Sequence, residues 1–129
     1  MKEDLESTGI VTWDVPMDKK IIAFTFDDGP NIIYTPKILE VLERYDAKST
    51  FFMIGFRMQQ EPQLVPDVLK KGHEIGNHIM NHLYAQNSTS QKIQQDILDG
   101  QKYIEKWSKD PLLFPPGGHV NETVFTTVK

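Results

Sequence analysis

The 129-residue chain contains no cysteine, so it has neither a disulfide framework nor a thiolate that could bind a metal or act as a nucleophile. It also has no excess of positive charge, because 14 lysine and arginine residues face 18 aspartate and glutamate residues, for a net charge of −4. A basic footprint for nucleic acid or an anionic membrane surface is therefore not expected. No apolar run approaches the length of a membrane span, and the first 14 residues lack the basic-then-apolar pattern of a signal peptide. The sequence thus predicts no nucleic-acid partner and no membrane span, and it leaves the location of the protein open.

What is present is ordinary for one globular domain, with 39% hydrophobic and 25% charged residues. Short β-rich runs alternate with stretches of helical periodicity, which is typical of strand–helix–strand units and a parallel sheet. We expect strands over 21–26, 49–54, 73–76 and 111–114, the first of them buried on both faces. Expected helices are one capped by Thr35, one that starts near Pro66 and ends before Gly72, one over 89–107, and a last turn or helix capped by Asn121. Residues 1–17 are predicted to form an N-terminal arm.

Three groups of residues each follow an expected strand directly: Asp27-Asp28, the pair His78 and His82, and the loop 115–118. The carboxyl ends of parallel strands gather at one edge of a sheet, where barrel and open-sheet enzymes place their sites. We therefore expect these three groups to meet. This convergence indicates an active site more strongly than any one of the motifs.

Asp27 and Asp28 begin the sequence Asp-Asp-Gly-Pro, which is a good turn in its own right, and judged alone the turn is the preferred interpretation. Two adjacent carboxylates at a strand end, however, repel one another unless a cation or a shared proton relieves them. A metal ion bound by one aspartate, with the other acting as a base, would provide that relief.

His78 and His82 are four residues apart, so on one helical turn both imidazoles would face the same way and suit a divalent metal. Two surface histidines at this spacing are also common without a metal. Ile79 stands where helix-borne zinc peptidases carry a glutamate base, so the pair is not that signature. Two histidines and one carboxylate would leave an open position for water, which is the catalytic arrangement for zinc.

The remaining candidates are weaker on their own. Gly117 and Gly118 would let backbone approach a ligand, and a free N–H there could stabilise an oxyanion, but a simple Pro-Gly turn is the preferred interpretation without the other loops. His73 is expected to pack or hydrogen-bond on its strand. His119 is expected to be solvated in its glycine-rich loop.

The segment IAFTFDDGP at 22–30 resembles the first motif of the polysaccharide deacetylases, the NodB homology domain of carbohydrate esterase family 4. The run AKSTFF at 47–52 and then GHEIGNH at 72–78 with His82 continue the resemblance in the right order. The resemblance covers residue 18 to the end, so 18–129 is expected to form part of such a domain. The long first motif followed by the spaced histidine pair makes it highly specific.

The resemblance implies the N-terminal part of a distorted (β/α) barrel, with parallel strands alternating with helices. It also implies metal-dependent removal of acetyl groups from an N-acetylated cell-wall or chitin-like glycan, with one divalent metal: zinc first, with cobalt, nickel or manganese as alternatives. By position, Asp28, His78 and His82 would hold the metal and Asp27 would be the general base. The resemblance further implies a backbone oxyanion contact at Gly117, and the adjoining Pro115 and Pro116 would contact substrate.

The sequence departs from the family pattern in several places. Ile79 replaces a serine or threonine, Leu83 replaces a proline, and the third motif, at 112–117, lacks its arginine. The family's later motifs, which include the histidine that protonates the leaving amine, have no match, and His119 does not fit that role in position or context. There are two alternatives to an active deacetylase. The chain could be an inactive relative that binds only metal or glycan, or it could be a fragment of a longer enzyme. Because these family motifs are missing, the chain as given is expected to have little or no activity on N-acetylated oligosaccharides.

Four short strands cannot close a barrel, so an incomplete barrel is expected. The unpaired edge of its last strand, near 112–114, together with uncovered barrel-facing sides on the strands 21–26 and 49–54, would favour self-association.

Overall fold

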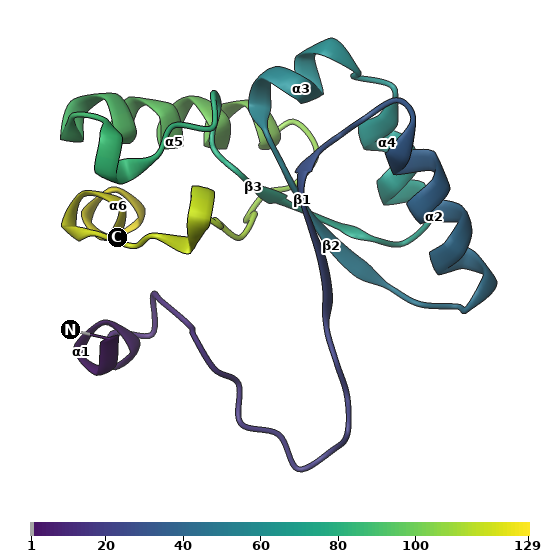
Figure 1. Ribbon diagram of the computed structural model, residues 1–129, viewed down its shortest axis with the longest axis horizontal. Coiled ribbons are helices and arrows are strands. Elements are labelled where there is room, and N and C mark those ends of the chain that lie inside the picture. The colour runs from purple at the N-terminus through teal and green to yellow at the C-terminus, as the bar shows by residue number, and fades with distance from the viewer. Residues whose placement is uncertain (1) are drawn as a thin grey trace.

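The computed structural model describes residues 2–129 and shows a parallel sheet with helices on both sides (Figure 1). The strands are β1 (Phe24–Gly29), β2 (Ser49–Met53) and β3 (Glu74–Asn77), in the order β1-β2-β3. The register of β1 shifts between Phe26 and Gly29, at the end of the strand that carries both aspartates. The fold is α/β as predicted, and the sheet of the described residues stays open, consistent with an incomplete barrel.

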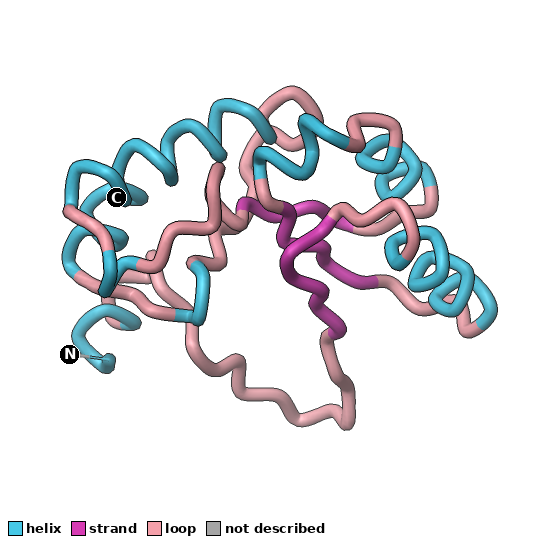
Figure 2. The backbone as a smooth tube through the Cα atoms, turned by 45° about the horizontal axis from the view of Figure 1, so that its top comes forward, coloured by secondary structure: helices cyan, strands magenta, loops and turns pink. Residues whose placement is uncertain are grey.

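The helices fall into two groups around the sheet (Figure 2). Helices α2 and α4 cover one part of the sheet, and the long helix α5 lies beside α6 at the other end (Figure 1). Their bounds are α1 Lys2–Glu6, α2 Tyr34–Arg44, α3 Gly55–Gln60, α4 Leu64–Lys70, α5 Ser90–Ile104 and α6 Glu122–Val128. Single 3₁₀ turns occur at Ala85–Asn87 and Pro116–Gly118.

Strand β1 corrects the prediction of a strand over 21–26 that is buried on both faces. Ile21 and Ile22 precede the strand with 58% and 78% of their surface exposed, and Phe24 is 48% exposed. The reason is that β1 pairs only with β2 among the described strands, so one side has no neighbour. Asp27 also lies within the strand rather than in a turn, because pairing continues as far as Gly29.

The next two strands differ from expectation in smaller ways. The side of 49–54 that was expected to be uncovered is buried: Phe51 and Phe52 are 2% and 7% exposed, and Phe52 packs on Phe114 with ring centroids 5.3 Å apart. The fourth strand is reduced to one bridge between Asn77 and Leu113, because only Asn77 of β3 makes backbone hydrogen bonds to this segment: its N–H donates to the Leu112 carbonyl and its carbonyl accepts from the Phe114 N–H.

The predicted cap of α2 is wrong. Thr35 is buried inside the first turn, and its hydroxyl accepts a hydrogen bond from the Asn31 backbone N–H at 2.9 Å. The N-cap position is Ile33, which makes no side-chain capping bond. Asn31, two residues earlier, accepts from the N–H groups of Ile33 and Tyr34 at 2.9 and 3.0 Å and so binds the free N–H groups at the helix start. Asparagine accepts such hydrogen bonds as well as threonine does, but Asn31 was not predicted in this role.

The other helix signals are confirmed. Pro66 lies in the first turn of α4, and Gly72 follows its end with a φ of 80°, which glycine adopts without steric penalty. Thr89 and Asn121 cap α5 and α6 by accepting from the backbone N–H groups of Lys92 and Val124. Helix α3, which directly follows β2, was not predicted. None of the described helices is long and apolar enough to cross a membrane.

Two apolar clusters hold these elements together. The larger lies between the sheet, α2, α3, α4 and the end of α5, and its buried members are Leu39, Leu42, Phe51, Met53, Met58, Val65, Val68, Ile75 and Ile104. The smaller joins α5 and α6 to the loop after β3, through Ile79, Ile93, Ile97 and Val124. The loop that carries both candidate histidines is therefore attached to the core by its own isoleucine.

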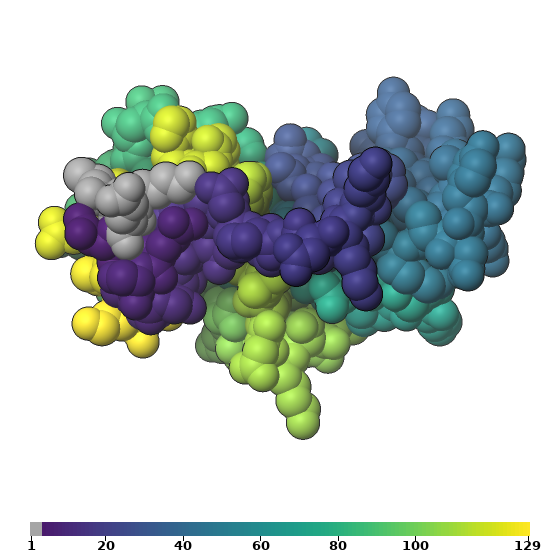
Figure 3. Space-filling model, turned by 90° about the horizontal axis from the view of Figure 1, so that it is seen from below, coloured from purple at the N-terminus to yellow at the C-terminus, as the bar shows by residue number. Residues whose placement is uncertain are grey.

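The segment before β1 runs across one face of the molecule (Figure 3). It begins with α1 beside α6, and residues 7–23 contain turns and bends but no helix or strand. Residues 10–13 line a cavity of about 810 Å³ together with residues of α5, α6 and 110–115, and the cavity lining includes neither of the paired histidines. The division into an arm at 1–17 and a domain at 18–129 stays a prediction.

Candidate metal centre at the carboxyl edge of the sheet

Asp28 reaches the site from a distorted part of β1. Its φ is 66°, a left-handed conformation that aspartate tolerates better than most residues. The guanidinium of Arg57, on α3, donates to the Asp28 backbone carbonyl at 2.6 Å. This contact fixes the backbone from which the carboxylate projects, and the side chain itself remains 56% exposed.

The two histidines lie in a loop, which corrects the expectation that they share a helical turn. Ile79 and His82 both have positive φ, 56° and 57°, so the chain between the histidines follows no helix. Such a φ is rare for a β-branched residue and costs on the order of 1–3 kcal/mol. Neighbouring elements must therefore hold the loop in place.

Backbone and side-chain groups hold this loop from two sides. From α3, the N–H groups of Gly55 and Phe56 donate to the carbonyls of Ile79 and Met80, both at 2.9 Å. From α5, the backbone carbonyl and carboxylate of Asp96 accept hydrogen bonds from the loop residues Met80, Asn81 and Leu83.

A third anchor comes from the strand that precedes the loop. The side-chain oxygen of Asn77 accepts from the Ile79 N–H at 2.8 Å, and the residue is fully buried.

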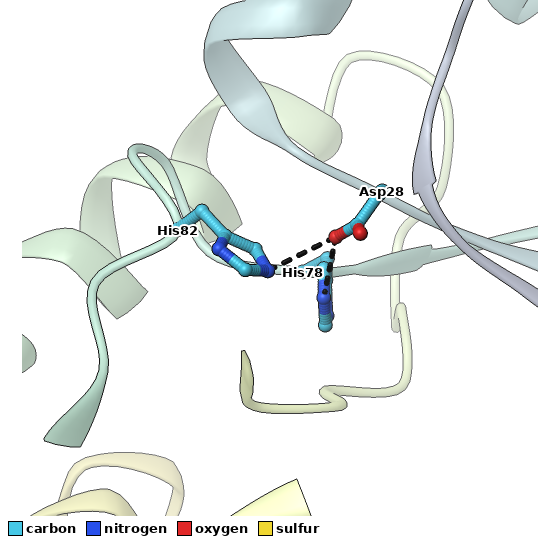
Figure 4. A group of neighbouring side chains, drawn as sticks. All are labelled: Asp28, His78 and His82. Atoms are coloured by element: carbon cyan, nitrogen blue, oxygen red, sulfur yellow. Dashed lines mark ion pairs between the residues drawn. The ribbon is translucent and has the colours of Figure 1, made fainter. Parts of the chain in front are cut away.

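The three predicted ligands meet, as Figure 4 shows. The Nε2 atoms of His78 and His82 lie 3.3 and 2.9 Å from the same Asp28 carboxylate oxygen. One ligand atom from each residue lies within 4.8 Å of the others. His78 is buried and His82 is about a quarter exposed, so the cluster opens to solvent on the side of His82 and Asp28.

The tautomer of His78 follows from its other ring nitrogen. Nδ1 lies 2.5 Å from the Phe114 backbone carbonyl, which can only accept, so Nδ1–H donates and, in the neutral ring, the lone pair is on Nε2, the atom that faces Asp28. Phe114 also stacks on the imidazole, with ring centroids 5.9 Å apart. Metal-binding histidines are typically oriented by such a bond from the second nitrogen.

The donor set fits a divalent cation. Two ligand atoms that bind one tetrahedral zinc at ~2.0–2.1 Å are separated by ~3.4 Å, close to the separations between Asp28 and the two imidazoles. Two imidazole nitrogens and one carboxylate oxygen also leave at least one coordination position free. The same donors accept several divalent ions, so the geometry does not select zinc by itself.

Asp27 adjoins this cluster as predicted. Its pKa is raised, first by partial burial of the carboxyl; His78 and His82 oppose the rise, and the neighbouring Asp28 carboxylate adds to it. The residue is exposed in the last part of β1, so solvent reaches it.

The loop 115–118 also packs near the histidines. Tyr84 links the two, since its ring makes an edge contact with His82 at 5.2 Å between centroids and lies beside Gly117. Gly117 has a φ of 70°, and the Gly118 N–H donates to the Pro115 carbonyl at 2.8 Å. Pro115 and Pro116 are buried, and their contact with substrate stays a prediction.

The other two histidines lie apart from the cluster. His73 is 5% exposed, contacts the Phe51 ring and lies 3.4 Å from the Ser49 hydroxyl, which agrees with the expected packing role. His119 is exposed, and its Nε2 lies 3.2 Å from the side-chain nitrogen of Gln86.

Sequence reasoning missed the residues that support the ligands. Asp96 had a visible signal, because it interrupts the apolar stripe of Ile93, Ile97 and Ile104 with a charge. Arg57 had none, since its partner is the backbone carbonyl of Asp28, which is distant in sequence. Asn77 bonds the backbone N–H of Ile79 only two residues on, but nothing in the residue pattern distinguishes this asparagine from one in an ordinary turn.

The fold and the donor set together define a class: an α/β protein with a candidate mononuclear metal centre at the carboxyl edge of a parallel sheet. The chain belongs to the polysaccharide deacetylase family, whose sequence profile matches residues 14–129. It is 62% identical over 130 residues to a peptidoglycan-N-acetylglucosamine deacetylase of Bacillus cereus, which it matches over its whole length.

Solved structures agree with this assignment. The peptidoglycan deacetylase PdaC from Bacillus subtilis is 36% identical, with a TM-score of 0.77 over 88% of this chain. A carbohydrate esterase family 4 pseudoenzyme from Bacillus anthracis is 25% identical, with a TM-score of 0.75 over 85% of this chain. The chain spans 61% of the length of the Bacillus cereus relative, 57% of the PdaC structure and 40% of the pseudoenzyme structure.

Proposed function

We propose that this chain carries a metal-dependent deacetylase site that removes acetyl groups from an N-acetylated glycan of the peptidoglycan or chitin type. The observation that carries the proposal is the meeting of Asp28, His78 and His82 around one point, with Asp27 beside it. The similarity to peptidoglycan deacetylases supports the glycan substrate.

Asp28, His78 and His82 would hold one divalent ion, and zinc fits the donor set. When bound, such an ion acidifies a water molecule and polarises the acetyl carbonyl. Asp27 accepts the proton of the attacking water, and its raised pKa brings it closer to the range in which a general base works best. The Phe114 carbonyl keeps the His78 ring in the ligating tautomer.

The loop after residue 114 would complete the acyl site. We infer that the Gly117 N–H donates to the developing oxyanion and that Pro115 and Pro116 adjoin the bound sugar. Tyr84, between this loop and His82, supports the placement of the loop beside the proposed ion.

Departure of an amine needs a proton, and this chain positions few groups to supply one. Of the four histidines, His78 and His82 would bind metal and His73 packs on Phe51, which leaves His119. A positioned general acid typically contributes ~10²–10⁴-fold. We therefore expect the chain to cleave activated acetate esters, whose leaving groups need no proton, far better than acetamides.

A relative that binds metal or glycan without catalysis is the second candidate. Two departures from the family pattern favour it. Ile79 replaces a residue with a hydroxyl group. The segment that contains Leu112 and Leu113 lacks the arginine that would orient Asp27. The Bacillus anthracis pseudoenzyme is similar in fold.

Acetate release by the zinc-loaded chain tests the two candidates. We expect slow hydrolysis of an aryl acetate that chelation abolishes and that Asp27→Asn lowers by ~10²–10⁴-fold. Asp46→Asn, on an exposed aspartate beyond the end of α2, is the matched control and should keep the rate. Turnover that survives Asp27→Asn would contradict the assigned base, and a zinc-loaded chain with no turnover would establish the non-catalytic candidate.

A further inference from the structure

Helix α5 places a buried carboxylate directly beneath the loop of the two histidines. Asp96 is 3% exposed and lies on the same stripe as Ile93 and Ile97, where an apolar side chain would be the ordinary choice. Among the described residues, no cation forms an ion pair with it. A buried carboxylate is unfavourable unless hydrogen bonds compensate it, so its partners explain its presence.

Those partners flank His82. Both carboxylate oxygens of Asp96 accept from the Asn81 backbone N–H at 3.1 Å, and one accepts from the Asn81 side chain at 2.6 Å. The other oxygen lies 3.5 Å from the Leu83 N–H. The backbone carbonyl of Asp96 accepts from the Met80 N–H at 3.0 Å. The carboxylate therefore holds the residue before His82 and approaches the residue after it.

His82 needs such a clamp more than His78 does. His78 follows β3 directly, is 3% exposed and has its ring fixed by the Phe114 carbonyl. His82 is 24% exposed and has a φ of 57°, a conformation that an unconstrained histidine seldom adopts. Its ring contact with Tyr84 does not fix the backbone from which it projects.

We propose that Asp96 is a positioning residue for the metal centre, which holds the backbone on both sides of His82 so that its Nε2 meets the ion shared with Asp28 and His78. The inference rests on the proposed metal site and adds to it a residue that touches no ligand atom. Groups that orient metal ligands in this way typically change metal affinity by ~10–100-fold when they are removed.

The test is a double-mutant cycle on zinc affinity, measured by competition with a chelator on full-length protein. Asp96→Asn should weaken zinc binding by ~10–100-fold in the wild-type background. In the His82→Ala background it should change the affinity by less than about twofold, because the residue on which Asp96 acts is gone. Asp99→Asn, an exposed aspartate on the same helix, is the matched control and should leave the affinity unchanged.

A purely structural role gives a different pattern. Asp96→Asn would then lower the unfolding free energy of the metal-free chain, while the folded protein kept its zinc affinity and the visible spectrum of its cobalt(II) form. We expect that spectrum to change, because one imidazole leaves the ion. Equal losses in both backgrounds, or no loss in either, would overturn the inference.

Two further outcomes keep the test decisive. If Asp96→Asn does not fold, Asn81→Ala removes only the exposed side-chain donor to Asp96, and it should weaken zinc binding at least threefold in the wild-type background alone. A wild-type chain that binds no zinc would refute the metal site and this inference with it. Zinc binding that both variants leave unchanged would refute this inference alone.

Discussion

The candidate centre combines chemical ligands with strained backbone. Asp28, Ile79 and His82 all have positive φ, which is uncommon for any residue but glycine and rarest for the β-branched isoleucine. Ile79 is stabilised by burial, at 1% exposure, and by the bond between its N–H and the Asn77 side chain. Strain of this kind persists only where the surroundings fix the conformation, and the contacts from α3 and α5 do so here.

His73 gives the chain a pH-dependent stability that is separate from the metal centre. Burial lowers the pKa of its imidazole, and the charges of Lys48 and Lys71 lower it further. The unfolded chain then binds the proton more tightly, so the stability from the neutral ring is present above about pH 6.5 and is lost as the pH falls.

We therefore expect the free energy of unfolding of metal-free protein to decrease between pH 7 and 5. His73→Gln should reduce this decrease, whereas His119→Gln, at an exposed site, should leave it as in the wild type. Urea unfolding at several pH values in the presence of a chelator measures the free energy of unfolding of the wild type and of each variant. An unchanged slope in His73→Gln would contradict the assignment.

At the scale of elements, α5 is the helix that packs against the histidine loop and supports it. It carries Asp96 beneath the histidine loop and Gly100 at the point of closest approach. A Cβ at Gly100 would lie 2.6 Å from the Asn77 side-chain oxygen, 2.8 Å from the Ile79 carbonyl carbon and 2.9 Å from the Met80 nitrogen. Two of these three atoms are backbone atoms of the loop, so the helix or the loop would have to move.

Gly100→Ala should destabilise the protein by about 1–3 kcal/mol, even though alanine favours a helix more than glycine does. Denaturant unfolding measures the change, and Lys102→Ala on the exposed side of α5 should stay within ~0.5 kcal/mol of the wild type. Stabilisation by Gly100→Ala would show that the loop is less closely held than these distances indicate.

The elements also show which features a sequence can specify. Helices α4, α5 and α6 were predictable because glycine, proline and capping residues act within a few residues of themselves. The limits of β1 were not, since Ile21 and Ile22 have strand-forming side chains but no neighbouring strand on which to pair. The histidine loop was mistaken for a helical turn because spacing alone cannot reveal the positive φ at Ile79.

The candidate ligands were predictable for a different reason. Parallel topology brings strand ends together, so Asp28 and the histidines could be placed at one edge without knowledge of any contact. Their supports, Arg57 and Phe114, act through backbone carbonyl groups that are distant in sequence, and only coordinates reveal these.

At the scale of the whole molecule, the open sheet is the main departure from a closed barrel. Strand β1 pairs on one side only among the described strands, and Ile22, Phe24 and Leu112 are 78%, 48% and 65% exposed. An unpaired strand with exposed apolar side chains favours association with a second copy.

We expect the isolated chain to sediment as dimers or larger species, and Phe24→Lys to shift it toward monomer. Val41→Lys, on the exposed face of α2, introduces the same charge in place of another exposed apolar residue and should leave association unchanged. Sedimentation velocity at several concentrations separates these outcomes. A concentration-independent monomer for the wild-type chain would contradict the prediction.

The central claim is that three side chains from two strand ends bind one divalent ion, and calorimetric titration of the metal-free chain with zinc tests it most directly. The account predicts binding near one ion per chain, with the heat lost in Asp28→Ala and His78→Ala, the affinity weakened but still measurable in His82→Ala, and the heat retained in His119→Ala. Zinc binding that persists unchanged in His78→Ala would contradict the site, as would the absence of binding by the folded wild-type chain.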